Sequence, residues 1–204
     1  MVNFTSELLI SKTIFMYLFF DTETTGLPKN WKAKITDFEN WPRLVQLAYV
    51  LYDDNGIVIS TGDHIVKPEG FTIPEGAAKV HGISTGKANQ IGEDLKTVLQ
   101  KFQTVIDQTE YLVAHNMNFD EKILGAEFLR NDMVNGIEHK TKICTMISSK
   151  EFCAIENSNG IKFPSLAELY FKLFNSEFEG AHNALADITA TAKCFWELKK
   201  LNKL

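Results

Sequence analysis

The first half of the chain alternates between apolar, β-rich segments and short turn sequences. Residues 17–24, 44–53 and 57–67 are rich in β-branched and aromatic residues, which predicts three strands. Asp54-Asn55-Gly56 separates the second segment from the third, and Asn-Gly is a strong signal for a hairpin turn. The pattern therefore predicts that the fold opens with an antiparallel meander.

After Gly92 the apolar residues recur at helical spacing, with short apolar runs between them. This predicts four helices, over residues 95–106, 118–128, 166–173 and 183–196, and two short strands over 111–114 and 142–146. Residues 151–162 are expected to form an exposed loop. Three strands followed by alternating helices and strands predict an α/β fold, with a mixed sheet flanked by helices.

Capping residues predict where some of these helices begin, and the apolar positions predict which face of the last helix is buried. Ser165 and Glu168 fit a capping box, and Asn118 with Glu121 resembles one. The apolar face of the last helix is expected to comprise Leu185, Ile188, Ala192, Phe195 and Trp196. Lysines at its end complement the helix C-terminus.

Composition and charge narrow the class of protein. The chain has 204 residues, 45% of them hydrophobic and 23% charged, which indicates a globular protein with a sizeable core. We expect a single domain over residues 16–204, preceded by an N-terminal extension, residues 1–15, without any motif. The net charge of -5 excludes a protein held to nucleic acid by bulk positive charge. Any phosphate-rich substrate must therefore be held locally.

The cysteines and the N-terminal segment suggest a location. The three cysteines form no C-x-x-C pair, which favours a reduced, cytoplasmic setting over a disulfide framework. The apolar stretch 8–20 is interrupted by polar residues and is too short to span a bilayer. It also lacks a cleavage site with small residues. We therefore expect neither a membrane segment nor a signal peptide.

Two carboxylates stand where an apolar strand ends. Asp21 and Glu23 follow Phe19-Phe20, and the strand period of two puts both on one face. Paired acids on a buried strand need compensation, and oxygen ligands without cysteine suit Mg²⁺ or Mn²⁺. The alternative is that the strand end is solvated and the acids begin a loop. Spacing alone leaves this alternative open.

Three further polar residues are candidates for the same site. Asp120 follows the fourth predicted strand, although the helix dipole alone could favour an acid there. Asp187 lies on the last predicted helix, where a rigidly held carboxylate suits a metal ligand. His182 precedes that helix, and its near-neutral pKa suits a general base. A capping or surface role for this histidine is the alternative.

Together these residues match a known pattern. Residues 20–27 (FDTETTGL), 114–120 (AHNMNFD) and 182–187 (HNALAD) resemble the three motifs of the DEDDh exonucleases, in the same order. This group includes the proofreading subunit of bacterial DNA polymerase III and RNase T. The resemblance implies a ribonuclease H-like fold, with an antiparallel meander followed by parallel strands.

The resemblance also implies a mechanism. Asp21, Glu23, Asp120 and Asp187 are expected to hold two Mg²⁺ or Mn²⁺ ions, which stabilise the attacking and leaving oxygens of an in-line displacement. His182 is expected to take a proton from the attacking water. The remaining candidates are substrate-binding residues: Thr24, Thr25, Gly26, Leu27, Gln46, His81 and Asn116.

The expected activity is 3′–5′ hydrolysis of single-stranded DNA ends to nucleoside monophosphates. It would suit proofreading or repair, with a DNA polymerase as a candidate partner and no membrane contact. An exoribonuclease acting on RNA ends is the alternative enzyme, and a non-catalytic accessory domain of a polymerase is the alternative from another class. Residues 28–42 form an insert with two tryptophans, which either contacts substrate or a partner, or only packs.

Overall fold

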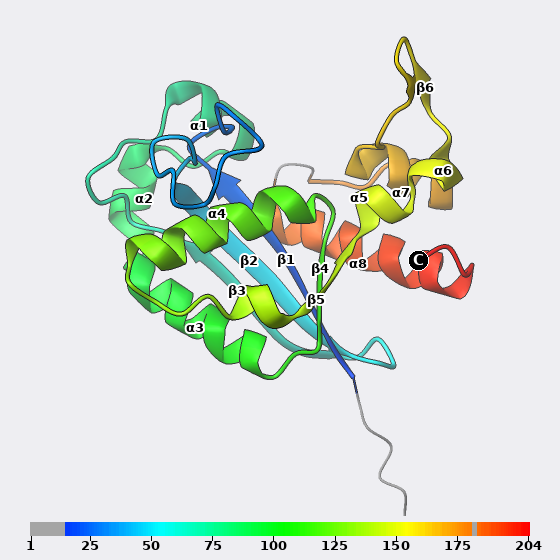
Figure 1. Cartoon of the computed structure of the whole chain (residues 1–204), viewed down its shortest axis with the longest axis horizontal. Helices are drawn as coiled ribbons and strands as arrows, with labels where there is room; N and C mark the ends of the chain where they lie inside the picture. The colour runs from blue at the N-terminus through cyan, green and yellow to red at the C-terminus, as the bar shows by residue number, and fades with distance from the viewer. Residues whose placement is uncertain (1–14, 181–182) are drawn as a thin grey trace, which may run out of the picture.

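A five-stranded sheet forms the centre of the structure. The computed structural model describes residues 15–180 and 183–204. The sheet comprises β1 (Met16–Thr24), β2 (Leu44–Asp53), β3 (Val58–Ile65), β4 (Tyr111–Ala114) and β5 (Thr141–Cys144), in the order β3-β2-β1-β4-β5 (Figure 1). β1, β2 and β3 pair antiparallel, whereas β1, β4 and β5 run parallel. The predicted mixed sheet is confirmed.

Helices cover both faces of this sheet. α3 (Leu95–Asp107) and α4 (Met117–Arg130) lie on one face, and α8 (Ala184–Lys200) lies on the other (Figure 1). Along β1, Leu18 and Phe20 belong to the core beneath α3 and α4, while Tyr17 and Phe19 belong to the core beneath α8. Because both faces are buried, β1 is apolar at every position until Asp21.

The predicted helices are found, with one error at an N-terminus. Ser165 and Glu168 form the expected capping box at α7 (Leu166–Phe174). The capping box at Asn118 and Glu121 was wrong, because α4 already begins at Met117. The Glu121 carboxylate instead forms an ion pair with Lys142 on β5, 2.7 Å away.

Among the described residues, five short helices and a hairpin were not predicted. α1 (Glu75–His81) buries no residue and α2 (Thr85–Ile91) buries only Ala88, so neither has a strong apolar period. The 3₁₀ helix η1 (Gly136–His139) precedes β5. The predicted loop 151–162 is largely exposed, but it begins within α6 (Lys150–Cys153), which follows α5 (Thr145–Ser148), and contains a hairpin of β6 (Glu156–Asn157) and β7 (Gly160–Ile161).

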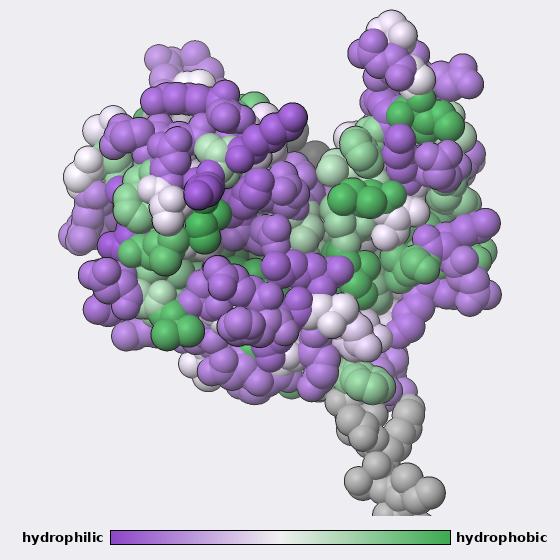
Figure 2. Space-filling view, viewed as in Figure 1, coloured by the Kyte–Doolittle hydropathy of each residue, from purple (hydrophilic) through white to green (hydrophobic). Residues whose placement is uncertain are grey.

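α5, α6, α7 and the β6–β7 hairpin form a lobe against α8 (Figure 1). Cys153, Leu169, Cys194 and Leu198 make up its buried cluster. Exposed hydrophobic side chains, including Ile161, Phe163 and Phe171, also belong to the lobe, and Figure 2 shows hydrophobic residues gathered on its surface. No helix among residues 15–180 and 183–204 is long and apolar enough to cross a bilayer.

The expected apolar face of α8 needs one correction. Ile188, Ala192 and Phe195 are buried against the sheet, but Leu185 is 39% exposed. Ala184, four residues before Ile188, occupies the buried position in the first turn. Of the expected N-terminal extension, only Phe15 lies within the described residues, so the division at residue 16 stays a prediction.

The capping box gives a test of the fold. Ser165→Ala removes the hydroxyl that accepts a hydrogen bond from the Glu168 N–H, 3.2 Å away. We expect the free energy of unfolding to fall by about 1 kcal/mol, measured by urea denaturation. Ser158→Ala, at an exposed position between β6 and β7, is the matched control and should leave stability unchanged. Equal stability of both variants would contradict the role assigned to the cap.

Candidate active site

Three carboxylates from two elements meet at the end of β1. Oxygens of Asp21, Glu23 and Asp187 all lie within 4.8 Å of one another. The strand period of two turns Asp21 and Glu23 toward α8, on the face that Tyr17 and Phe19 occupy further down the strand. Asp187 lies in the first turn of α8. The fold thus brings Asp187 to the two acids of β1, although it is more than 160 positions away in the sequence.

The start of α8 is fixed by its cap. The Asn183 side chain accepts a hydrogen bond from the Ala186 N–H at 3.2 Å, and the Asn183 carbonyl accepts one from the Asp187 N–H at 2.9 Å. An N-cap asparagine is among the best helix starters. It therefore sets where the helix begins, and with it the position of Asp187 beside β1.

Asp120 reaches the cluster from α4, which covers the face of the sheet opposite to α8. Its side chain is only 2% exposed, and its Oδ1 accepts hydrogen bonds from the Thr22 N–H at 3.2 Å and the Thr22 hydroxyl at 2.7 Å. The pairing of β4 with β1 ends at Phe19 and Val113, so no strand partner faces Thr22 on that side. The carboxylate satisfies a buried backbone donor that would otherwise lack a partner.

Burial and mutual repulsion raise the pKa values of these acids. The pKa of Asp21 lies well above its ordinary value because of burial, and then because Asp120, Glu23 and Asp187 are close. Burial, Asp187 and Asp120 raise the pKa of Glu23 to about 7. Burial raises the pKa of Asp120 to about 7, although the hydrogen bonds from Thr22 oppose the shift.

For Asp21, Glu23 and Asp120, burial and the neighbouring carboxylates outweigh the hydrogen bonds that would lower the pKa values. The donor set fits a hard divalent cation, because all its atoms are carboxylate oxygens. A bound cation would favour the charged forms and relieve the repulsion. The site residues are therefore suited to Mg²⁺ or Mn²⁺.

The segment after β1 is ordered by its own hydrogen bonds. The Thr24 hydroxyl donates to the Gly26 carbonyl at 2.6 Å, and the Thr25 hydroxyl accepts from the Arg43 N–H at 3.0 Å. Gly26 has a φ of 148°, which a side chain would strain. Leu27 follows with 73% of its surface exposed. These four predicted substrate-binding residues follow Glu23 directly in the sequence.

The other predicted substrate-binding residues border the same end of β1. Gln46 lies opposite Glu23 in the β1–β2 register, and its side-chain amide donates to Asp63 at 2.5 Å. His81 ends α1 near the Thr24 backbone, and burial lowers the pKa of its imidazole. Asn116 is the N-cap residue of α4. His182 lies outside the described residues.

Thr22 is a site residue that the sequence reasoning missed. Its N–H and hydroxyl both donate hydrogen bonds to Asp120, yet only its place between Asp21 and Glu23 could have drawn attention to it.

His115 has a structural role, away from the carboxylates. Its ring nitrogens contact the Thr145 hydroxyl at 3.0 Å and the Pro164 carbonyl at 3.1 Å, and burial lowers its pKa to about 4. It therefore links β4 to the lobe as a neutral residue.

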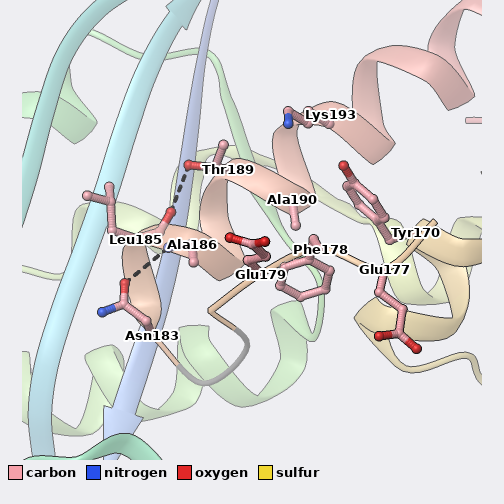
Figure 3. A pocket seen from close by; sticks show the side chains of 10 residues that line it. All are labelled: Tyr170, Glu177, Phe178, Glu179, Asn183, Leu185, Ala186, Thr189, Ala190 and Lys193. Carbon is pink, nitrogen blue, oxygen red and sulfur yellow. Dashed lines mark hydrogen bonds between the residues drawn. The ribbon is translucent and has the colours of Figure 1, made fainter. Parts of the chain in front are cut away.

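A cavity of about 470 Å³ also lies beside α8. Figure 3 shows Tyr170 and Phe178 facing Ala190 and Lys193 across it, with Glu177 and Glu179 nearby. None of the four clustered acids lines this cavity. It is therefore separate from the carboxylate cluster at the end of β1.

Comparison with known families agrees with this geometry. A family model described as exonuclease, RNase T, matches residues 18–195. The chain belongs to this exonuclease family. The match spans all four clustered carboxylates and confirms the resemblance to the DEDDh exonucleases. The comparison with curated proteins gave no significant match.

Solved structures with the same fold include those of exonuclease I. Escherichia coli exonuclease I in complex with a dT13 oligonucleotide is 22% identical, with a TM-score of 0.72 over 91% of this chain and 41% of that one. The zinc-bound complex of the E. coli enzyme with single-stranded DNA has 20% identity and a TM-score of 0.71, over 92% of this chain and 41% of that one. This chain thus spans about two fifths of the length of exonuclease I.

The raised pKa values predict how stability varies with pH in EDTA. Glu23 is neutral below about pH 4, both folded and unfolded, so Glu23→Gln should then change little. As pH rises toward 7 the unfolded carboxyl ionises freely while the folded one resists, so the wild type loses stability relative to the variant. We expect Glu23→Gln to be more stable by about 1–3 kcal/mol above pH 7.

Thermal unfolding across pH 4 to 8 measures this difference. Glu151→Gln on α6 is the matched control, because the Glu151 side chain is largely exposed and lies far along the chain from β1. Its melting temperature should follow that of the wild type at every pH. A Glu23→Gln variant that is less stable than the wild type at pH 8 would show that the carboxylate stabilises the metal-free fold.

Proposed function

We propose that the chain is a metal-dependent 3′–5′ exonuclease that releases nucleoside monophosphates from the ends of single-stranded DNA. The observation that carries the proposal is the convergence of Asp21, Glu23, Asp120 and Asp187 at one strand end, in a chain of the exonuclease family. The exonuclease I structures that share this fold hold single-stranded DNA, which supports DNA as the substrate.

The roles of the residues follow from their positions. Asp21, Glu23 and Asp187 would hold the ions, and Asp120 would contribute from its place beneath Thr22. Two Mg²⁺ or Mn²⁺ ions bound there would activate a water and stabilise the charge that develops on the phosphate. His182 would accept the proton of the attacking water.

The neighbouring segments would receive the 3′-terminal nucleotide. Thr24, Thr25 and Gly26 place backbone groups beside the carboxylates, and exposed Leu27 offers an apolar contact for a base. Gln46, His81 and Asn116 would complete the rim. A protein of net charge -5 can hold a polyanion in this way, because the ions and the contacts to a strand end replace a basic groove.

The cellular setting is a further part of the proposal. All three cysteines, Cys144, Cys153 and Cys194, are free thiols, which supports a cytoplasmic location. Proofreading or repair alongside a DNA polymerase is the setting we propose for the activity.

Metal dependence tests the proposal directly. EDTA should abolish the hydrolysis of end-labelled single-stranded DNA, and Mg²⁺ or Mn²⁺ should restore it. Asp187→Asn should lower kcat by about 10²-fold or more, because metal assistance is worth several kcal/mol in the transition state. Asp132→Asn, at an exposed position where asparagine tolerates the backbone φ of 53°, is the control with normal activity.

Parallel assays on duplex DNA and RNA distinguish the alternatives. Faster hydrolysis of RNA would identify an exoribonuclease. Full activity in chelator would contradict the metal mechanism, and no hydrolysis of any nucleic acid would favour the accessory role.

The role of His182 can be separated from that of the carboxylates. His182→Ala should reduce turnover by about 10²–10⁴-fold, as expected for the loss of a general base, while the Mn²⁺ affinity changes little. In the wild type, turnover should rise with pH as the imidazole loses its proton. His182→Asn retains a polar side chain. Near-normal turnover of that variant would remove His182 from the catalytic residues.

A further inference from the structure

The insert between β1 and β2, residues 28–42, is hydrogen-bonded to α4. Lys122 on α4 donates a hydrogen bond to the Trp31 carbonyl at 2.9 Å. Arg130 at the end of α4 donates to the carbonyls of Phe38 and Trp41, both at 2.8 Å. In Figure 1 the insert is the blue loop that lies over α4, beside the end of β1. Two cations of one helix therefore hold both halves of the insert.

The two tryptophans of the insert have opposite environments. Trp41 is 2% exposed, and its indole N–H donates to the Lys34 carbonyl at 2.9 Å, so it packs. Trp31 keeps 42% of its surface exposed although its backbone is held. A large aromatic side chain that is both fixed and exposed is a common feature of binding surfaces.

Trp31 also contacts the helix that carries Asp120. Its ring packs against the ring of Phe119, with 5.7 Å between the ring centroids. Phe119 immediately precedes Asp120, whose carboxylate is held by Thr22 in the cluster. Trp31 therefore packs on the first turn of α4, the turn that also carries Asp120.

Three exposed lysines lie close to Trp31 in the sequence. Lys29 and Lys32 are exposed on either side of it in the sequence, with Lys34 exposed two residues further on. The acids of the insert, Asp37 and Glu39, instead flank Phe38 at its other end. An aromatic ring among lysines suits a nucleic-acid strand, because a base stacks on the ring and the phosphates contact the ammonium groups.

We propose that Trp31 stacks on a base of the single strand, upstream of the 3′-terminal nucleotide. The inference rests on the proposed function and adds a residue that sets how the strand is held. Stacking on an aromatic ring needs only the face of a base, so the contact is tolerant of sequence. This contact supplies binding energy outside the acidic cluster. Such a contact is needed because the carboxylates of the cluster would themselves repel phosphates.

The test compares Trp31→Ala and Trp31→Phe with the wild type on single-stranded DNA in Mg²⁺. Trp31→Ala should raise KM by about 5- to 100-fold, the range expected for the loss of one stacked base, with kcat nearly unchanged. Trp31→Phe keeps a stacking ring and should restore most of the affinity. Phe38→Ala is the matched control, because Phe38 is 41% exposed in the same insert, but acids flank it in the sequence and the Arg130 guanidinium lies over its ring at 5.1 Å.

An abasic site moved along the strand locates the contact. At one upstream position, loss of the base should weaken wild-type binding but not binding by Trp31→Ala. Binding is measured by fluorescence anisotropy of the labelled oligonucleotide in an Asp21→Asn background, so this readout does not depend on hydrolysis. Melting temperatures confirm that each variant is folded.

The outcomes separate this inference from the proposed function. An active wild type with an unchanged KM in Trp31→Ala would overturn the stacking role alone. The same holds if the abasic penalty is equal for the wild type and Trp31→Ala at every position, or if Phe38→Ala weakens binding as much as Trp31→Ala. A position-specific loss in the anisotropy assay supports stacking, even if hydrolysis fails and the proposed activity is wrong.

Discussion

The crowding of carboxylates at the end of a buried strand is the constraint on which the rest of the structure depends. Asp21 and Glu23 leave the core on the face covered by α8, and Asp187 and Asp120 reach the same place from α8 and α4. Burial raises the pKa values of these acids, and each neighbouring carboxylate raises the pKa of Asp21 further. Without a bound cation, this arrangement of carboxylates lowers the stability of the folded protein.

The mixed sheet explains why the cluster can form there. β2 runs antiparallel to β1 along its whole length, whereas β4 pairs only as far as Phe19 and then gives way to α4. The edge of β1 beyond that point is open to the first turn of α4. Asp120 fills it by accepting both hydrogen bonds of Thr22. The site thus lies where parallel pairing stops, in agreement with the general placement of ligand sites at strand ends in α/β sheets.

The sequence predicted the sheet well because its signals are local. The bounds of β2 and β4 were predicted correctly, and the hairpin after Asp53 follows from Asn-Gly. α1 and α2 were missed because they bury almost nothing. The α4 start was misplaced because the spacing of Asn118 and Glu121 imitates a capping box, whereas the helix begins at Met117 and Glu121 pairs with Lys142.

The site was predictable only in part. Spacing put Asp21 and Glu23 on one face, but only the resemblance to the exonuclease motifs connected them with Asp120 and Asp187. The support that Thr22 gives to Asp120 depends on where β4 stops, and the contrast between Trp31 and Trp41 depends on how α4 holds the insert. Both are tertiary properties, so no local pattern reports them.

The most direct test of this account is the number of protons released when Mn²⁺ binds. Calorimetric titrations at pH 6.5 in two buffers of different ionisation enthalpy measure it. Because Glu23 and Asp120 have pKa values of about 7 without metal, both are partly protonated at this pH, and binding should expel protons. The account predicts clear proton release at pH 6.5 that diminishes by pH 8.5. Tight binding without proton release, or no binding of Mn²⁺, would contradict it.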